Sequence, residues 1–395
     1  MALRISDGEY GRRRERLFQR LKDRGIEAVV LFSGHNVGYF CRFAFMPTER
    51  PMAAVVTPDR AELLVPRLEL EHAEENALVD KVVAYPEYPG RRPALSYLAE
   101  MLEGLGLARG ALGVDQDGYA RIYGSRGPKL SELTPQAGVV DVLDDIEHLQ
   151  MINTDEELAL IRESAKWGNL AHTYLQEFSR VGVSETEISL RASLEATLAM
   201  LRALGPSYRA GAGESGAFAG FRGQIGKHSA LPHAVSTNAR LRPGDLLVTG
   251  ADAIVWGYGS ELERTMVMGE PSKEQEKFFR LMLEVQTEAI AALRPGIPCS
   301  QVDEGTLRFF REHDLQPYWR HHTGHAKSQL VHEAPFLDQG DDRVIEVGMV
   351  FTVEPGIYVP ELGGFRHSDT VLVTEHGAEF LTYYPRDLES LVIPV

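Results

Sequence analysis

The sequence is poor in cysteine. Its 395 residues include only Cys41 and Cys299, which lie far apart. Such a pair excludes a disulfide-rich secreted fold and is typical of a reducing compartment, so we expect a cytoplasmic location.

Long apolar runs are missing as well. The first residues show no apolar core of signal-peptide length, and no stretch approaches the roughly 20 apolar residues of a membrane span, so we expect no membrane partner.

Positive charge is also scarce. Lys and Arg total 41 against 57 Asp and Glu, which gives a formal net charge of -16. Because an acidic surface repels phosphate groups, this balance argues against nucleic acid or an anionic membrane as the main partner. The remaining composition, 44% hydrophobic and 25% charged, is that of an ordinary globular protein.

The length exceeds what one hydrophobic core usually supports, so we expect two domains. In residues 1–148, short apolar runs alternate with segments whose apolar residues have helical spacing. The runs predict strands over 27–32, 52–57, 61–66 and 110–115, and the segments predict helices over 9–24, 69–77 and 93–107. This alternation predicts a smaller N-terminal α/β domain.

Residues 149–395 have a different pattern. Thr154 with Glu157 forms a capping box that predicts a helix over 155–180, and Ser184 begins a second helix that reaches about residue 204. Further helices are expected over 272–293 and 300–313, and β-rich blocks over 246–268, 348–359 and 370–381. Strand runs separated by helices favour an α+β domain with a mostly antiparallel sheet.

A glycine-rich run over 210–223 could be mistaken for a phosphate-binding loop. It lacks the Lys-Ser/Thr ending of a P-loop, and it follows a predicted helix rather than a strand. We therefore expect no nucleotide site there.

Glu261 and Glu263 lie in the stretch YGSELERTM, which we interpret as part of a β-hairpin. Residues two apart on a strand share a face, so both carboxylates would point the same way, and one could keep a proton near neutral pH. The pair is either an acid–base or cation-binding pair, or two acids on a solvated strand edge. Arg264, on the other face, is expected to be a structural partner.

Other candidates come from later motifs. Glu354 lies in the apolar stretch VFTVEPGIYV, where a buried carboxylate without a partner or a role would be unfavourable. His325 and His332 are seven residues apart, which is not a zinc-binding spacing, and each alone is more often structural. His233 follows Pro232 in a loop and is a candidate general base.

Taken together, these segments resemble the pita-bread hydrolases, which include methionine aminopeptidase, aminopeptidase P, prolidase and creatinase. The shared motifs are a Pro-His loop before LRPGDLL, a G-Y-x-S-x-x-x-R-T hairpin, a G-H-x6-H-E-x-P stretch, GMVFTVEPGIY and GGFRHSDTVLVTEHG. NVGYF in the first domain resembles the amino domain of prolidase and creatinase. The resemblance implies a creatinase/prolidase-type N-terminal domain followed in the chain by a pita-bread catalytic domain over 149–395.

The resemblance also implies five metal ligands, and this sequence departs from them. The metallopeptidases of the family share two aspartates, one histidine and two glutamates. The equivalent positions here are Gly250, Glu261, His325, Glu354 and Ser368. Since two positions carry no carboxylate, we expect no metal cofactor. If an ion is present, its expected ligands are the three retained side chains, with Asp252 as a conceivable substitute.

Creatinase, a metal-free relative, replaces the same ligands and also carries LERT. This likeness implies catalytic roles for His233, Glu263 and Glu354. It places Arg50 where an arginine of creatinase enters the neighbouring subunit's site, so it implies a homodimer. A second substrate-binding arginine of creatinase corresponds to Phe336, which argues against creatine itself. The remaining residues expected to bind substrate are Glu261, His325, His332 and Arg366.

We therefore expect a metal-independent, creatinase-like hydrolase of a C–N bond in a small zwitterionic substrate. His233 would act as acid and base, while Glu263 and Glu354 would bind the substrate cation. One alternative is an Xaa-Pro dipeptidase or aminopeptidase with a divalent metal (Mn, Co, Zn or Fe) in an altered site. A second is a non-catalytic binding protein with the same fold.

Overall fold

The computed structural model describes residues 3–211 and 216–395, and the chain divides into two compact units, Ile5–Gln150 and Met151–Val395. The domain boundary expected near residue 148 falls within helix α6 (Leu143–Met151). Four residues of the glycine-rich run over 210–223 lie outside the described part of the chain, as do the first two residues of the N-terminal stretch.

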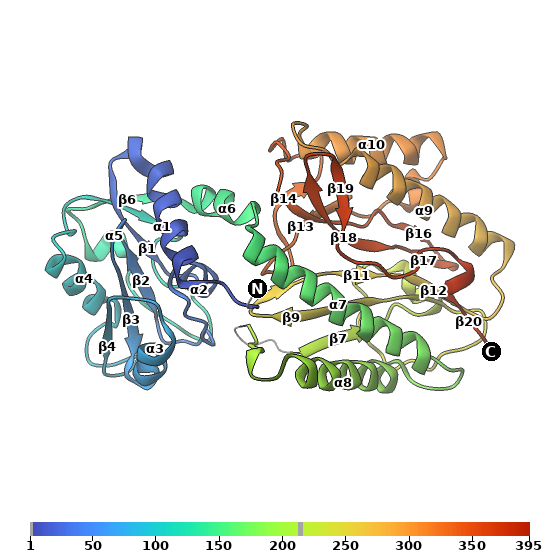
Figure 1. The fold of residues 1–395 in the computed structure, drawn as a ribbon, viewed down its shortest axis with the longest axis horizontal. Helices are drawn as coiled ribbons and strands as arrows, with labels where there is room; N and C mark the ends of the chain where they lie inside the picture. Colours follow the sequence, from blue (N-terminus) through green and yellow to red (C-terminus); the bar gives the residue numbers. More distant parts are fainter. Residues whose placement is uncertain (1–2, 212–215) are drawn as a thin grey trace. The chain divides into compact units, whose positions relative to one another are not determined.

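The N-terminal unit is built on a mixed sheet with the strand order β4-β3-β2-β1-β5-β6 (Figure 1). Its strands are β1 (Ile26–Leu31), β2 (Ala53–Val56), β3 (Ala61–Pro66), β4 (Lys81–Tyr85), β5 (Ala111–Val114) and β6 (Gly138–Asp141). Its helices before α6 are α1 (Asp7–Leu21), α2 (Gly34–Cys41), α3 (Leu70–Asn76), α4 (Leu95–Gly104) and α5 (Leu130–Leu133). The strands and helices predicted for this part are confirmed, with small shifts at their ends.

Helices cover both faces of this sheet. Val29 and Leu31 of β1 pack in one apolar cluster with Leu17 of α1, whereas Val30 packs in a second cluster with Leu98 of α4. Because successive side chains of a strand point to opposite faces, a strand buried on both sides is apolar at every position. This explains the apolar run from Ala28 to Leu31 in β1, which follows the exposed Glu27.

The C-terminal unit contains a large antiparallel sheet with the strand order β10-β9-β11-β18-β15-β13-β14, which β7 and β19 extend through β9 and β18. Its strands are β7 (Gly216–Gly220), β9 (Gly250–Val255), β10 (Tyr258–Gly259), β11 (Leu262–Glu263), β13 (Gly324–Ala326), β14 (Glu333–Leu337), β15 (Val350–Val353), β18 (Ser368–Thr374) and β19 (Gly377–Phe380). Two small sheets comprise β8 (Leu246–Val248), β12 (Thr265–Met268) and β20 (Val392–Ile393), and β16 (Ile357–Val359) and β17 (Gly363–Phe365). The expected α+β class is confirmed.

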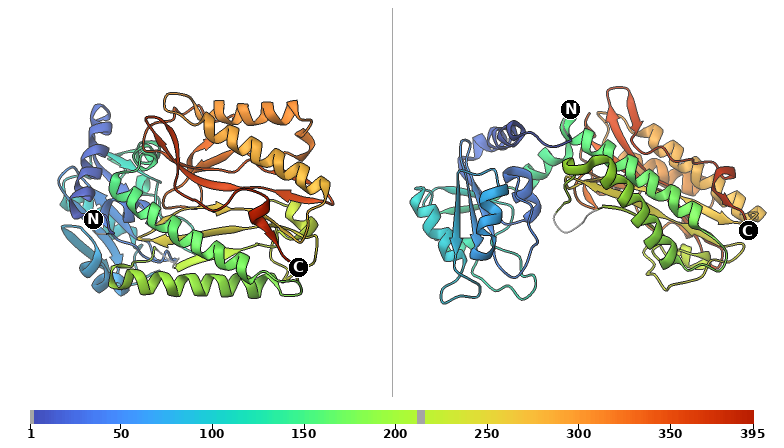
Figure 2. Two further views of the ribbon diagram at one scale, coloured as in Figure 1. Left: turned by 45° about the vertical axis from the view of Figure 1, so that its right-hand side comes forward. Right: turned by 60° about the horizontal axis from the view of Figure 1, so that its bottom comes forward.

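Two pairs of helices pack on this unit. Helices α7 (Asp155–Phe178) and α8 (Glu185–Leu204) lie side by side along β9 and β7, as both views in Figure 2 show. Helices α9 (Lys273–Ala292) and α10 (Cys299–Glu312) pack against each other near β14, β15 and β19. The predicted capping box is present, since the Thr154 hydroxyl accepts from the Glu157 amide and the Glu157 carboxylate accepts from the Thr154 amide.

The stretch around Glu261 contains the predicted hairpin with one interruption, because β10 and β11 both pair antiparallel with β9 in the same register. It is split into three short strands: β10 pairs with β9, β11 lies between β9 and β18, and β12 pairs with β8 in another sheet. The chain therefore changes sheets once within this stretch, between β11 and β12, and Glu261 lies in the interruption between β10 and β11.

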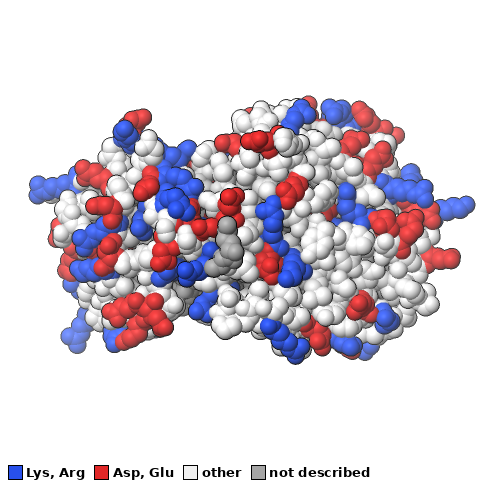
Figure 3. All heavy atoms as spheres, in the orientation of Figure 1, with Lys and Arg blue, Asp and Glu red and all other residues white. Residues whose placement is uncertain are grey.

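The surface carries mixed charge. On the face drawn in Figure 3, acidic and basic side chains are interspersed in both units, so the acidic excess does not form one continuous patch on that face. Within the described residues, no helix combines the length and the apolar character needed to cross a membrane.

Candidate active site

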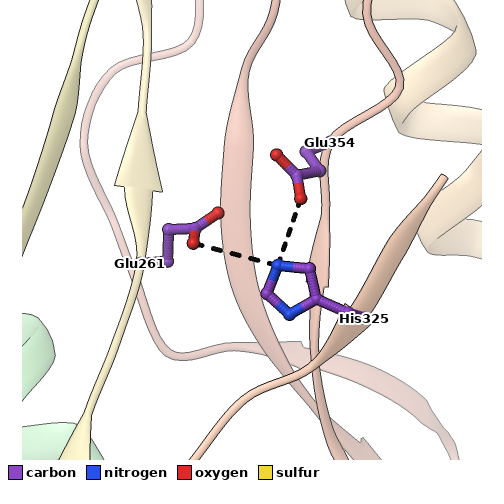
Figure 4. Close-up of side chains that lie close together, drawn as sticks. All are labelled: Glu261, His325 and Glu354. Carbon is purple, nitrogen blue, oxygen red and sulfur yellow. Dashed lines mark ion pairs between the residues drawn. The ribbon is translucent and has the colours of Figure 1, made fainter. Parts of the chain in front are cut away.

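Three side chains from separate strands of the large sheet converge in the C-terminal unit (Figure 4). Glu261 comes from the break before β11, His325 from β13 and Glu354 from the position directly after β15. The Nε2 atom of His325 lies 3.3 Å from Glu354 Oε1 and 4.0 Å from Glu261 Oε2. Among the described residues, this is the one group of acids and histidines whose ligand atoms all lie within 4.8 Å of one another. Asp252 does not belong to it.

The orientation of the His325 ring is set by its other nitrogen. Nδ1 lies 2.9 Å from the carbonyl oxygen of Ala326, which can only accept, so Nδ1 donates. Nε2 is buried, has no hydrogen-bond partner and faces the two carboxylates. A neutral ring held in this way directs a lone pair from Nε2 toward carboxylate oxygens, and this arrangement requires a proton or a cation between them.

The pKa values of the three side chains also indicate that a positive charge is favourable between them. Burial raises the pKa of Glu261 to about 7, and the neighbouring Glu354 and Glu263 add to the rise. Burial alone would also raise the pKa of Glu354, but the adjacent His325 imidazole, with Nε2 3.3 Å from Glu354 Oε1, and the charge of Arg366 outweigh burial and hold that pKa below its usual range. Burial would lower the pKa of His325, yet the two glutamates raise it to about 9. A divalent cation would satisfy all three groups at once.

Glu263 lies beside this group in a different setting. Its carboxylate is buried and is paired with two guanidinium groups, those of Arg222 and Arg366. Arg366 also reaches toward Glu354, with 3.8 Å between Nε and Oε2, and donates to the Tyr358 hydroxyl. Glu263 is therefore the acidic member of a buried charge cluster, and its catalytic role stays a prediction.

The two positions without a carboxylate flank Glu263. Leu262 pairs with Ala251 of β9 and Glu263 pairs with Ser368 of β18, so Gly250, Glu263 and Ser368 lie in one row across three strands. The Ser368 hydroxyl donates to Glu261 Oε1 over 2.8 Å. Ser368 thus orients one member of the ligand group.

Several other predicted residues lie around the group. The ring of His332 is 4.3 Å from that of His325, centroid to centroid. Burial lowers the pKa of His332, and the neighbouring His325 and, to a smaller extent, His233 lower it further. His233 itself is exposed in a turn. Phe336 pairs with His325 across β13 and β14. The roles predicted for these residues stay predictions.

Arg50 belongs to the N-terminal unit. It forms ion pairs there with Glu49 and Glu87. Its predicted reach into a neighbouring subunit stays a prediction.

Two residues near the group were not singled out from the sequence. Arg222 follows β7 and pairs with Glu263, and Tyr358 connects Arg366 to His321 through its hydroxyl. A signal for Arg222 existed in the sequence: Gly250 frees space and Glu263 adds a buried negative charge, which together call for a nearby cation. Nothing in the sequence indicated which arginine would supply it.

The three converging side chains fit one divalent metal ion. They offer one imidazole nitrogen, which is buried and unpartnered, and two carboxylates, and this donor set suits several divalent metals. They do not provide the further carboxylates that a pair of bridged ions requires, because positions 250 and 368 are glycine and serine.

Comparison with known families agrees with this geometry. Residues 159–375 match the model of metallopeptidase family M24, and residues 13–152 match that of the creatinase/prolidase N-terminal domain.

Relatives align over nearly the whole chain. The sequence is 30% identical to the Xaa-Pro dipeptidase of Pyrococcus furiosus over 379 residues, 95% of this chain and 99% of that protein. The structure is similar to an Xaa-Pro dipeptidase from Bacillus anthracis, with a TM-score of 0.78, 27% identity and coverage of 98% and 100% of the two chains. It is also similar to the dipeptidase PepE from Mycobacterium ulcerans, with a TM-score of 0.82, 26% identity and coverage of 99% and 100%.

These findings correct two expectations. The expectation of a metal-independent, creatinase-like hydrolase is wrong, and so is the expectation of no cofactor. The catalytic unit matches a metallopeptidase model, and the relatives are Xaa-Pro dipeptidases. The error came from treating the loss of carboxylates at Gly250 and Ser368 as the loss of all metal binding, although Glu261, His325 and Glu354 still converge. The expectations of a pita-bread fold and of a hydrolase are confirmed. The chain therefore belongs to metallopeptidase family M24.

Proposed function

We propose that this chain is an Xaa-Pro dipeptidase that depends on a divalent metal ion held by Glu261, His325 and Glu354. The observation that carries the proposal is the buried, unpartnered Nε2 of His325, which faces two carboxylates within a family M24 catalytic unit. The relatives support the substrate class, since the Pyrococcus furiosus enzyme aligned over 95% of this chain is an Xaa-Pro dipeptidase.

The protein's own residues would share the work around the ion. Glu261, His325 and Glu354 would hold a divalent ion, which would supply Lewis-acid chemistry for hydrolysis of the peptide bond. His233, exposed in its turn, would take a proton during attack and deliver one to the leaving proline nitrogen. Phe336, the cross-strand partner of His325, and His332, whose ring is 4.3 Å from that of His325, would offer ring faces suited to packing against a prolyl ring.

Two further features belong to this proposal. Arg50 would enter the site of a second subunit and pair with the substrate carboxylate, which implies a homodimer. Cys41 and Cys299 are free thiols in the buried interior, and they support a reducing cytoplasm as the location.

A turnover panel with controlled metal content tests the proposal. The protein would be stripped with a chelator, reloaded separately with Mn²⁺, Co²⁺, Zn²⁺ or Fe²⁺, and assayed with Ala-Pro, Met-Pro, Ala-Ala, Ala-Pro-Ala and creatine. We expect hydrolysis of the two Xaa-Pro dipeptides, loss of that activity on chelation and recovery on reloading.

Two results would contradict it. Turnover of Ala-Pro that survives complete metal removal would rule out the metal dependence. Silence of every reloaded sample on all five substrates would favour the alternative of a non-catalytic binding protein.

A further inference from the structure

Arg222 lies at a sharply constrained corner of the backbone after β7. Its φ of 52° is in the left-handed region that side chains other than glycine rarely adopt, and Gly223 follows with a φ of 76°. A Cβ atom at position 223 would collide with the carbonyl of Val235, so only glycine fits there. Backbone strain of this kind persists where the surrounding structure enforces it, often at functional sites. Here it directs the Arg222 side chain toward β9 and β11.

The guanidinium group of Arg222 lies directly over Gly250. A Cβ atom built on Gly250 would be 3.3 Å from both Cζ and Nη2 of Arg222, closer than most such contacts. A side chain at position 250 would therefore require the guanidinium to shift by at least a few tenths of an ångström. The position that carries a ligand aspartate in the metallopeptidases resembling this chain is covered here by a positive charge.

The charge of Arg222 is anchored on one side and accessible on the other. Nη2 donates to Glu263 and, over 3.4 Å, to Gln224, whereas 43% of the side chain is exposed. Glu263 is also paired with Arg366, so the carboxylate that could have bound a second ion is shared between two guanidinium groups. Ser368, the other altered position, donates its hydroxyl to Glu261.

We propose that Arg222 takes the place of a second metal ion, so that the site binds one divalent ion, at Glu261, His325 and Glu354, beside a fixed guanidinium. The inference rests on the proposed function for the presence of the first ion. A guanidinium supplies one positive charge with several N–H donors in a rigid fork. It repels a second cation and leaves donors for an oxygen of the substrate.

The first experiment measures metal stoichiometry and involves no turnover. The stripped protein is titrated with Mn²⁺ in a calorimeter, and the reloaded protein is analysed by mass spectrometry for Mn per chain. We expect one ion per chain at saturation. Two tightly bound ions per chain in the wild type would overturn the inference.

The second experiment removes the charge of Arg222. Arg222→Gln is compared with Arg294→Gln, a matched control that removes an exposed arginine of the same unit. Loss of a neighbouring positive charge should tighten Mn²⁺ binding about tenfold in the first variant. It should also raise KM for Ala-Pro, whereas the control should change neither quantity. An unchanged Mn²⁺ affinity in Arg222→Gln would show that its charge does not act on the metal position.

The two proposals fail in different ways. One Mn²⁺ per chain without hydrolysis of any Xaa-Pro dipeptide would contradict the proposed function and leave the role of Arg222 standing. Hydrolysis of Ala-Pro with two ions per chain would do the reverse. Absence of any bound ion in the titration would overturn both.

Discussion

Strands β11 and β18 carry two charge clusters that differ in how completely their polar atoms are paired. One contains Arg264 and Asp369, both fully buried, with 2.8 Å between Nη2 and Oδ1. The other contains Glu263 of β11 and Ser368 of β18, which directly precede Arg264 and Asp369 in the chain and pair with each other, whereas Arg264 itself follows β11. Because side chains alternate along a strand, a shift of one residue moves the chemistry from one face of the sheet to the other.

The Arg264 cluster is closed. The Arg264 guanidinium donates to Asp369 and to backbone carbonyl groups, those of Glu263, Ser368, Tyr384 and Pro385. Asp369 also accepts from Thr382 and Gln286. A buried ion pair with every polar group matched has nothing left to offer a ligand, so we interpret it as a structural element that fixes the two strands.

The Glu263 cluster is open. Arg222 is partly exposed, and the adjacent His325 retains a buried nitrogen with no partner. The comparison teaches that charge and burial alone do not mark a site, since both clusters have them. A buried nitrogen that has no hydrogen-bond partner and faces two carboxylates does, because this arrangement is unfavourable unless a proton or a cation completes it.

The largest effect on activity is expected from a substitution beside the open Glu263 cluster. His325→Ala removes the nitrogen ligand, so we expect stoichiometric Mn²⁺ to be lost and kcat/KM for Ala-Pro to fall by at least about 10³-fold, more than the loss of an outer partner of a metal ligand would cause. Metal analysis and steady-state kinetics measure the two changes. His376→Ala, in an exposed turn, serves as the control and should leave both values unchanged. Retained Mn²⁺ in His325→Ala would refute the ligand assignment.

The next largest effect is a loss of stability and is expected from a substitution in the closed Arg264 cluster. Asp369→Ala leaves the buried Arg264 charge uncompensated, so we expect a loss of about 3–5 kcal/mol in the free energy of unfolding. Urea denaturation measures it. Glu379→Ala is the matched control, because it breaks an exposed pair with Arg162 and should cost less than about 1 kcal/mol. If the two variants were equally stable, the closed cluster would not be the structural element we describe.

A smaller effect separates two buried histidines. Burial, with the charge of Arg264, lowers the pKa of His172 to about 3, whereas His325 has its pKa raised. The unfolded chain binds a proton at His172 near pH 6.5 and the folded chain does not, so this residue removes stability as the pH falls from about 6.5 toward 3. The slope approaches about 1.4 kcal/mol per pH unit.

The variant His172→Gln isolates that contribution. Its free energy of unfolding should fall less than that of the wild type between pH 7 and pH 5.5, by about 1 kcal/mol. Urea denaturation at both pH values measures the difference. Parallel pH profiles for the two proteins would mean that His172 is not held neutral in the folded state.

The elements were predictable where local physics decides them. Capping by Thr154 and Ser184 fixed the starts of α7 and α8, and alternation between two buried faces fixed β1. The hairpin around Glu261 was predictable, but the pairing of β11 with β18 was not, because β11 has only two residues and this partner lies far away in the sequence. Pairing of that kind depends on the assembled sheet.

For the site, the sequence alone determined the inventory: Glu261, His325 and Glu354 are present, and positions 250 and 368 have no carboxylate. Only the tertiary structure decided how these residues are arranged and which ligand they can bind. It brings the three ligands together from strands far apart in the chain, and it places the Arg222 guanidinium over Gly250. The physical reason is that electrostatic interactions depend on distances of a few ångströms across strands, which sequence separation does not encode.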